Sequence, residues 1–254
     1  MRIVTWNIAG CRTVRSAKQF DYYEGENRKY FLEHLAALQP DVVCLQETHG
    51  NRSYSLAKEL AKELEMPHVF EKRCCPSHID SQYKLCNAIL SRQPFTDPRA
   101  KLLPHPSFQL YLHDKPVPPF DRYLISVQFP GFRVATLHVE PLDILGYDYS
   151  EGLGLEFGHT IDEFLVKQLE APFVFTADLY AAHPTIPFPK FMSQFSLQDV
   201  LPAQVPTDPK GLRPDHIMCT PEWLPIHARV IPTQTDHFLC VADLQPDFQT
   251  SAFQ

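Results

Sequence analysis

The feature that most constrains this chain is a series of polar residues at the ends of apolar, strand-like runs. A carboxamide, several carboxylates and two histidines occupy these places: Asn7, Glu47, His138, Asp178, Asp215, Asp236 and His237. Folds with parallel strands bring ligand-binding residues to the strand ends. Oxygen and imidazole groups gathered on one rim are typical of sites that bind a divalent metal and cleave phosphate esters. The sequence therefore indicates a chemistry more clearly than a substrate.

Apolar periodicity predicts alternating strands and helices in the first half of the chain, followed by a half in which strands dominate. The predicted helices are 28–38, 54–65 and 157–169. The predicted strands are 2–7, 41–46, 68–70, 87–90, 123–129, 132–139, 172–177, 215–219, 226–231 and 238–244, with a hairpin across Pro130-Gly131. This order of elements indicates an α/β (α+β) fold, with mixed sheets inside and helices outside.

No Gly/Ser-rich linker, charge block or internal repeat divides the 254 residues. We therefore expect one domain over residues 1–244 and a loosely attached tail at 245–254. The formal net charge of −7 provides no basic face for duplex nucleic acid. Nucleic acid is disfavoured as a substrate but stays open, because bound Mg²⁺ offsets acidic charge near its site.

Seven cysteines at irregular spacings do not match a disulfide framework, which indicates a reducing compartment. Four of them fall inside apolar runs, where cysteine usually acts as a small core residue: Cys44, Cys86, Cys219 and Cys240. The pair Cys74-Cys75 lacks zinc spacing and is expected to be incidental. The first strand begins at Arg2 and no apolar run approaches the ~20 residues of a membrane span, so the expected location is cytoplasmic. The sequence does not indicate an oligomeric state.

Proline is abundant, with 24 residues, and glycine is scarce, with 9. Prolines cluster between Pro94 and Pro119 and again from Pro184 to Pro225. Because proline restricts φ and lowers the entropy lost on folding, these stretches are expected to be stiff, ordered loops. Two interpretations stay open: the loops border the cleft and select substrates, or they are ordinary surface connections.

Three of the polar residues are suited to a metal. Glu47 ends an apolar strand, and a carboxylate is a natural ligand for a hard cation such as Mg²⁺. Asn7 ends the first strand and Asp236 begins the last, so both regions of the chain can contribute to one site. Taken singly, each residue has an ordinary alternative, as a solvated acid or a turn-forming amide.

The other polar residues are suited to proton transfer and phosphate binding. His138 is placed to donate a hydrogen bond to a phosphate oxygen, and His237 to stabilise charge or move a proton. Asp215 could fix the tautomer of His237 and favour its charged form. Asp178 could orient or deprotonate the attacking water. Each has a structural alternative, but the ordered series as a whole favours a site.

Seven short segments carry a further signal when they are considered in order. They are TWNIAG at 5–10, PDVVCLQET at 40–48, NAILSRQP at 87–94, ATLHVE at 135–140, FTADLY at 175–180, PDHIMCT at 214–220 and TDHFLCVADL at 235–244. This ordered set resembles the endonuclease/exonuclease/phosphatase superfamily of metal-dependent phosphoesterases. That superfamily includes abasic-site endonucleases, pancreatic-type deoxyribonucleases, sphingomyelinases and inositol polyphosphate 5-phosphatases. The resemblance covers essentially residues 1–244.

By this resemblance, the expected fold is a four-layer sandwich of two stacked mixed β-sheets flanked by helices. The resemblance implies a Mg²⁺ site, with Mn²⁺ as an alternative, formed by Glu47, Asn7 and Asp236. It implies catalytic roles for His138, Asp178, Asp215 and His237. Asp178 would activate water, and the two histidines would contact the scissile phosphate. The implied reaction is in-line attack of water on phosphorus.

The main departure from the family pattern lies at Tyr180. The family pattern Gly-Asp-x-Asn is Ala-Asp-Leu-Tyr here, at 177–180. Tyr180 therefore replaces an asparagine that helps to hold the water or the phosphate. Because a phenol donates one hydrogen bond, Tyr180 is expected to bind substrate in an altered way or to leave activity low.

Two further departures bear mainly on substrate. Ala9 stands where some nucleases place an acidic residue, so metal binding would depend more on Glu47 and Asp236. The helix before the Asp178 strand lacks the expected Arg/Gln pattern and carries Glu156, His159 and Asp162.

The predicted function is a metal-dependent phosphoric ester hydrolase, a phosphodiesterase or nuclease-like enzyme. The acidic charge keeps two alternatives open, a phosphomonoesterase and a lipid or small-molecule phosphodiesterase. Tyr180 motivates a second class, a phosphate-ligand-binding protein with weakened catalysis. The predicted partner is a phosphoester substrate, with nucleic acid included. The natural substrate, the preferred metal and endo- or exo-cleavage stay open.

Overall fold

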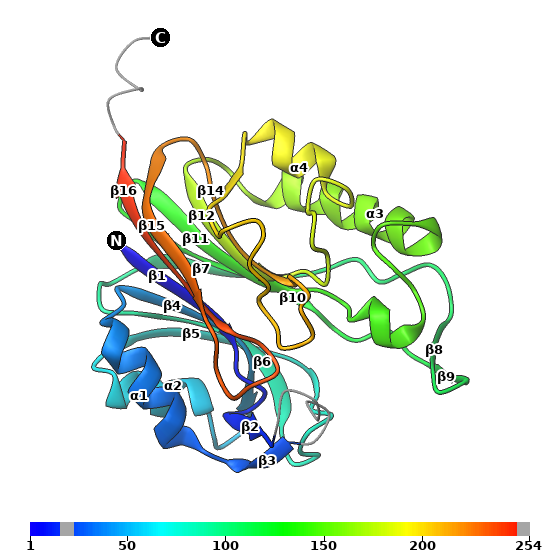
Figure 1. Ribbon diagram of the computed structural model, residues 1–254, viewed down its shortest axis with the longest axis horizontal. Helices are drawn as coiled ribbons and strands as arrows, with labels where there is room; N and C mark the ends of the chain where they lie inside the picture. The colour runs from blue at the N-terminus through cyan, green and yellow to red at the C-terminus, as the bar shows by residue number, and fades with distance from the viewer. Residues whose placement is uncertain (16–22, 248–254) are drawn as a thin grey trace.

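Two six-stranded mixed β-sheets form the framework of the computed structural model, which describes residues 1–15 and 23–247 (Figure 1). Across the first sheet the strands are β15 (Trp223–Ile231), β16 (Leu239–Pro246), β1 (Arg2–Asn7), β4 (Val42–Gly50), β6 (Lys84–Ser91) and β5 (His68–Pro76). Across the second they are β13 (Gln198–Asp199), β14 (Asp215–Cys219), β12 (Phe173–Asp178), β11 (Phe132–His138), β10 (Tyr123–Phe129) and β7 (Thr96–Leu102). The predicted pair of mixed sheets is confirmed.

The remaining described elements are short hairpins and helices. The hairpins pair β2 (Arg12–Val14) with β3 (Tyr23–Glu26) and β8 (Leu110–Leu112) with β9 (Lys115–Val117). The helices are α1 (Arg28–Leu38), α2 (Leu56–Glu63), the 3₁₀ helix η1 (Leu142–Leu145), α3 (Gly152–Gln168) and α4 (Pro189–Gln194).

Each sheet contains one pair of parallel neighbours, β1 with β4 and β11 with β12. In these pairs Asn7 lies opposite Gln46, and His138 lies opposite Asp178. Asn7, His138 and Asp178 end their strands, whereas β4 continues to Gly50, beyond the predicted end at residue 46. The parallel pairing brings these polar residues to the same edge of each sheet. Asn7 Nδ2 donates a hydrogen bond to Asp178 Oδ2 at 3.0 Å, so the two edges meet.

Apolar side chains pack in three layers that leave the helices outside the sheets. Ile3 and Val174 belong to the layer between the two sheets. Trp6 belongs to the layer under α1 and α2, and Phe175 to the layer under α3 and α4. Figure 1 shows the two helix pairs on opposite sides of the stacked sheets. This is the four-layer arrangement that the resemblance predicts.

The first proline-rich stretch contains strands, which the sequence interpretation missed. It includes β7, which lies at the sheet edge beside β10, and the β8–β9 hairpin. Pro98 lies where the β7–β10 pairing shifts register, between Ser126 and Gln128 of the partner strand. Because proline cannot donate to a ladder, an edge strand with a bulge is where a sheet accepts it.

Helix α3 begins at Gly152, well before the predicted start at Phe157. Glycines lower the helix propensity of its first turns, so the sequence pattern did not reveal them. Two of these glycines allow close packing. A Cβ on Gly154 would lie 2.0 Å from Asp148 O, and one on Gly158 would lie 2.7 Å from Pro187 Cβ. Both neighbours belong to loops that border the cleft described below.

All seven cysteines are buried and unpaired, as expected for a chain without a disulfide framework. Strand β16 extends to Pro246, two residues beyond the predicted domain boundary at residue 244. Residues 248–254 of the predicted tail lie outside the described residues. Among the helices of residues 1–15 and 23–247, none is long and apolar enough to cross a membrane.

Asp162 of α3 caps helix α4 from outside that helix. Its Oδ1 accepts from Phe191 N at 2.7 Å and its Oδ2 from Lys190 N at 3.0 Å, and the residue is 1% exposed. Asp162→Ala is expected to lower the free energy of unfolding by about 2–3 kcal/mol, because two amide donors lose their acceptor. Urea denaturation followed by circular dichroism measures this change. Glu163→Ala, which removes an exposed ion pair with Lys190, should leave the midpoint unchanged.

Candidate active site

A cleft of about 830 Å³ contains the polar residues predicted from the sequence. Those that line it are Asn7, Glu47, Tyr180, Asp236 and His237. His138, Asp178 and Asp215 are almost fully buried, and each contacts a lining residue. The structure therefore brings all of the predicted site residues to one place.

Glu47 reaches the cleft because strand β4 contains a bulge. The pairing of β4 with β6 shifts register between Leu45 and Thr48, so Gln46 and Glu47 together face Asn87. Glu47 has a φ of 54°, in the left-handed region. A bulge re-aims side chains relative to the strand alternation, and strained backbone of this kind clusters at functional sites.

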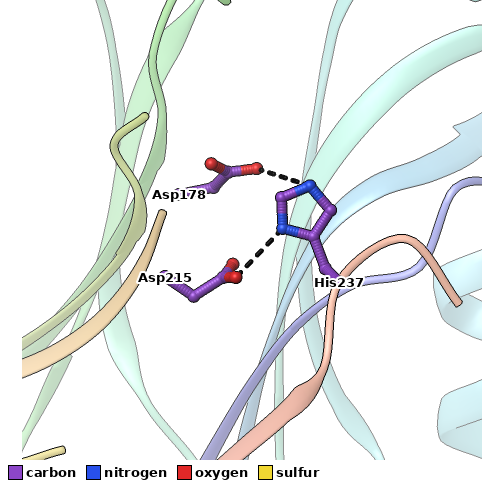
Figure 2. Close-up of side chains that lie close together, drawn as sticks. All are labelled: Asp178, Asp215 and His237. Atoms are coloured by element: carbon purple, nitrogen blue, oxygen red, sulfur yellow. Dashed lines mark hydrogen bonds and ion pairs between the residues drawn. The ribbon is translucent and has the colours of Figure 1, made fainter. Parts of the chain in front are cut away.

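His237 is held between two carboxylates, as Figure 2 shows. Its Nδ1 lies 3.0 Å from Asp215 Oδ2, and its Nε2 lies 3.6 Å from Asp178 Oδ2. Burial opposes charge on the imidazole, but Asp215 and Asp178 outweigh it and raise the pKa of His237 well above its usual range. Burial also raises the pKa of Asp178, against the opposing charge of His237. The arrangement favours an imidazolium that Asp215 orients.

Asn7 connects the first sheet to this group. Its Nδ2 donates to Asp178, and its Oδ1 accepts from Ala9 N at 3.2 Å. The turn that follows needs Gly10, which has a φ of +64° and where a Cβ would lie 2.3 Å from the ring of His49. Since an amide oxygen has two lone pairs, Asn7 Oδ1 retains one for a further ligand.

Arg122, which sequence reasoning missed, fixes the tautomer of His138. Arg122 Nη1 donates to His138 Nδ1 at 3.1 Å, so Nδ1 is the acceptor and Nε2 carries the proton. Burial, together with the charge of Arg122, lowers the pKa of His138 well below its usual range. Glu47 Oε1, 3.9 Å from Nδ1, is too distant to compete. His138 is therefore neutral, and its buried Nε2 has no hydrogen-bond partner.

The sequence does contain a signal for Arg122. Arg122 precedes the apolar run of β10, which pairs antiparallel with β11. The amino end of β10 therefore lies at the same edge as the carboxyl end of β11, where His138 is found. Like Asp215 and Asp236, Arg122 is a polar residue that comes at or just before the start of an apolar strand, and this position is the sequence signal for it.

In a Glu140→Gln background, Arg122→Met is expected to abolish the Nε2–H tautomer preference of His138. Glu140 Oε2 lies 3.8 Å from Arg122 Nε, so the background avoids leaving a buried carboxylate unpaired. Without the Nη1 donor, Nδ1 is free to carry the proton, and the two ring ¹⁵N shifts should converge in an NMR spectrum. The free energy of unfolding should fall by about 1–3 kcal/mol, since a buried acceptor loses its partner. Glu140→Gln alone should keep the wild-type shifts; unchanged shifts in the double variant would contradict the role of Arg122.

Tyr180 places its ring beside both histidines. Its ring centroid lies 5.8 Å from that of His138 at 24°, and 6.5 Å from that of His237 at 86°. Burial raises the pKa of the phenol well above its usual range, and Asp178 adds to this effect. The residue that departs from the family pattern therefore forms an aromatic wall of the cleft and keeps its hydroxyl proton.

Glu47 and Asp236 form one candidate site for a divalent cation. Burial raises the pKa of Glu47, and the charge of Asp236 raises it further against the opposing effect of His78. Asp236 Oδ2 accepts from Tyr23 Oη at 2.6 Å, whereas its Oδ1 is buried without a hydrogen-bond partner. Two carboxylates that line the same cleft, one with an unpartnered oxygen, fit a hard cation. Tyr23 follows no apolar run, so no sequence pattern marked it as a site residue.

Asp178, Asp215 and His237 form a second group whose ligand atoms lie within 4.8 Å of one another. In this group His237 Nδ1 already bonds to Asp215, and Asp178 Oδ2 already accepts from Asn7. A cation there would have to displace a charged imidazole from two carboxylates. The Glu47–Asp236 pair is therefore the better candidate for a cation site among the described residues.

Comparison with known proteins identifies the family of the chain. The sequence profile of the Endonuclease/Exonuclease/phosphatase family matches residues 4–237. No curated protein matches the chain. Among solved structures, an endonuclease/exonuclease/phosphatase from Beutenbergia cavernae is 17% identical, with a TM-score of 0.70 over 97% of this chain and 71% of that chain.

Two further solved structures share the fold. An AP endonuclease from Archaeoglobus fulgidus is 17% identical, with a TM-score of 0.60 over 96% of this chain and 99% of that chain. A mannosyl-6-phosphatase from Bacteroides thetaiotaomicron is 14% identical, with a TM-score of 0.61 over 96% of this chain and 99% of that chain. Because the profile spans nearly all of the chain, the chain belongs to the endonuclease/exonuclease/phosphatase family of phosphoester hydrolases.

Proposed function

We propose that this protein is a divalent-metal-dependent phosphodiesterase that cleaves a P–O bond by in-line attack of water. One observation carries the proposal: the Glu47–Asp236 carboxylates share a cleft with a histidine held between Asp215 and Asp178. Family membership supports the reaction class. Fixed positive groups directed at the developing negative charge of a phosphoryl group are the main source of catalysis in such reactions.

Glu47 and Asp236, with the remaining lone pair of Asn7, are proposed to hold the cation. Mg²⁺ is the expected ion because all three donors are oxygens, and Mn²⁺ accepts the same donors. When bound, the cation would neutralise charge on a phosphoryl oxygen. The unpartnered Oδ1 of Asp236 supports this assignment.

Asp178 is proposed to orient the attacking water and to accept its proton. Its Oδ1 is buried without a hydrogen-bond partner, while Asn7 fixes its Oδ2. Burial raises the pKa of Asp178, which strengthens the carboxylate as a base. His237, charged and oriented by Asp215, would stabilise the negative charge on phosphate. His138 would donate its Nε2 proton to a phosphate oxygen.

Hydrolysis of bis-(p-nitrophenyl) phosphate tests this proposal. The purified protein is expected to release p-nitrophenol with Mg²⁺ or Mn²⁺, and EDTA should lower the rate at least about 100-fold. Adding back the metal should restore the rate. Turnover that is indifferent to EDTA would contradict metal dependence. Faster hydrolysis of p-nitrophenyl phosphate than of the diester would show a phosphomonoesterase instead.

A phosphate-ligand-binding protein is the second candidate, and the ring of Tyr180 beside His138 favours it. The ring stands where the family pattern places a carboxamide, so the amide group that would hold a water or phosphate is absent there. Under this candidate, the wild type binds phosphate without turnover and Tyr180→Asn gains hydrolysis. Tyr180→Phe, which keeps the ring, should not gain it. Turnover of the diester by the wild type would reject this candidate.

A further inference from the structure

Besides carboxylates and histidines, the cleft contains exposed aliphatic side chains. Ile144 is 56% exposed, Ile186 41% and Leu212 54%, and all three line the cleft. They come from three separate segments: helix η1, the loop after β12 and the loop before β14. Apolar side chains that converge from separate segments on one cavity are typical of ligand sites. We refer to these three residues as the apolar rim.

Buried core residues pack next to the apolar rim. Leu145 and Tyr149 also line the cleft, yet they are almost fully buried and belong to the core layer under α3 and α4. Tyr149 Oη donates to Glu140 O at 3.0 Å. Pro187, next to the rim residue Ile186, packs closely on Gly158 of α3. Because these neighbouring residues are already packed, binding an apolar group to the rim costs little additional conformational entropy of the chain.

The charges beside the apolar rim disfavour a polyanion. Asp143 and Asp148 are exposed and line the cleft. Of the arginines and lysines among the described lining residues, Arg122 and Arg213 are buried and only Lys210 is exposed. Nucleic-acid binding depends on several lysine or arginine contacts to phosphates. The described residues of the lining do not provide such a set.

We propose that the substrate is a phosphodiester in which one alcohol is an apolar alkyl or aryl group that packs on the apolar rim. The proposal rests on the proposed hydrolase function and adds the substrate class. The cleft volume of about 830 Å³ suits a single amphiphilic molecule, because small-molecule sites range over roughly 300–1,000 Å³. Asp143 and Asp148 would repel a second phosphate at the rim, so the group there is uncharged.

A series of p-nitrophenyl alkyl phosphates tests this substrate class. Methyl, butyl and octyl esters share one leaving group, so their intrinsic reactivities are similar and differences in kcat/KM report the alkyl contact. In the wild type with Mn²⁺, kcat/KM is expected to rise at least about tenfold from methyl to octyl, which corresponds to about 1.4 kcal/mol. A flat series with clear turnover would overturn the apolar site while leaving the hydrolase intact.

Substitutions in the apolar rim test whether these residues cause the rise in kcat/KM with alkyl length. The triple substitution Ile144→Thr, Ile186→Thr and Leu212→Asn should flatten the series, so that kcat/KM rises less than about twofold from the methyl to the octyl ester. The control pair Leu224→Asn and Ile226→Thr removes exposed apolar side chains of β15 outside the cleft and should keep the full rise. An unchanged rise in the triple variant would overturn the assignment of the rim.

Binding separates failure of the inference from failure of the proposed function. Calorimetry with octyl phosphate and methyl phosphate needs no turnover. At least tenfold tighter binding of octyl phosphate without hydrolysis of any ester would support the apolar site and reject the hydrolase. Equal binding without hydrolysis would overturn both. Cleavage of monomeric dihexanoyl phosphatidylcholine but not of dioleoyl phosphatidylcholine vesicles would indicate a small-molecule source for the substrate, and cleavage of both would indicate a lipid.

Discussion

Glu47→Gln is expected to lower metal-dependent diester hydrolysis by a factor on the order of 10²–10³, the loss typical of removing one group that stabilises transition-state charge. The amide keeps the shape of the side chain but loses the charge that holds the cation. Calorimetric titration with Mn²⁺ should show much weaker binding in the same variant. Glu71→Gln is the matched control, because Glu71 is another carboxyl group whose pKa burial raises and it does not line the cleft. Wild-type rates in Glu47→Gln would remove Glu47 from the metal site.

The same substitution is expected to stabilise the protein in EDTA. Burial raises the pKa of Glu47 above its ordinary value of 4.5, so the native state binds more protons than the unfolded state above that pH. The unfolding free energy of the wild type therefore falls as pH rises from about 4.5. The amide of Glu47→Gln does not ionise, so this variant does not lose unfolding free energy at this position as pH rises. Its melting temperature should therefore exceed that of the wild type at pH 7. A lower melting temperature in EDTA would show that Glu47 supports the fold.

His237→Ala is expected to lower kcat by about 10²–10⁴-fold, the range for a positioned acid–base group. The substitution removes the charged imidazole and leaves Asp178 and Asp215 without the ring that separates them. The rate of bis-(p-nitrophenyl) phosphate hydrolysis at saturating Mn²⁺ measures the loss. His183→Ala is the matched control, since His183 is an exposed histidine that also lines the cleft. Full activity in His237→Ala would remove the central group of the proposed mechanism.

A double-variant cycle tests how Asp215 acts. If Asp215 works by orienting and charging His237, then Asp215→Asn should cost less than His237→Ala, and combining them should add little. Additive losses would instead indicate that Asp215 contributes to the reaction without His237.

Sequence patterns predicted the elements whose ends are marked locally. Helix α1 has the predicted bounds because Asn27 caps it, accepting from Tyr30 N at 3.3 Å, and Pro40 follows it. Strands β1, β10 and β14 also match, since each is an apolar run with polar neighbours. Strand β7 was missed because it lies at a sheet edge, where little apolar surface is buried. The start of α3 was missed because its glycines serve tertiary contacts.

In the candidate site, too, the residues marked by local sequence were predictable, and those that depend on tertiary packing were not. Residues at strand ends were predictable, because the strand direction alone brings them to one edge. The bulge that turns Glu47 into the cleft depends on the register of β4 against β6, which one strand does not reveal. Ile144, Ile186 and Leu212 were not predictable, since they meet only when three loops pack on α3 and its neighbours. The proline-rich stretch from Pro184 does border the cleft, which was one of two open interpretations.

The second sheet is built from one continuous stretch of chain, 96–219, whereas the first combines 2–91 with 223–246. Met1 N donates to Leu244 O at 2.8 Å, so the two separate parts of the first sheet are hydrogen-bonded to each other. In the order of the chain, the second sheet is an insertion into the first. The two parts then each contribute one portion of the site, Glu47 and His237 from the outer part, Asp178 and Asp215 from the inserted part. The rate of the reaction therefore depends on how the two sheets pack against each other. A substitution in the apolar layer between them is expected to change the rate without touching substrate, and loss of activity on heating should mark their separation.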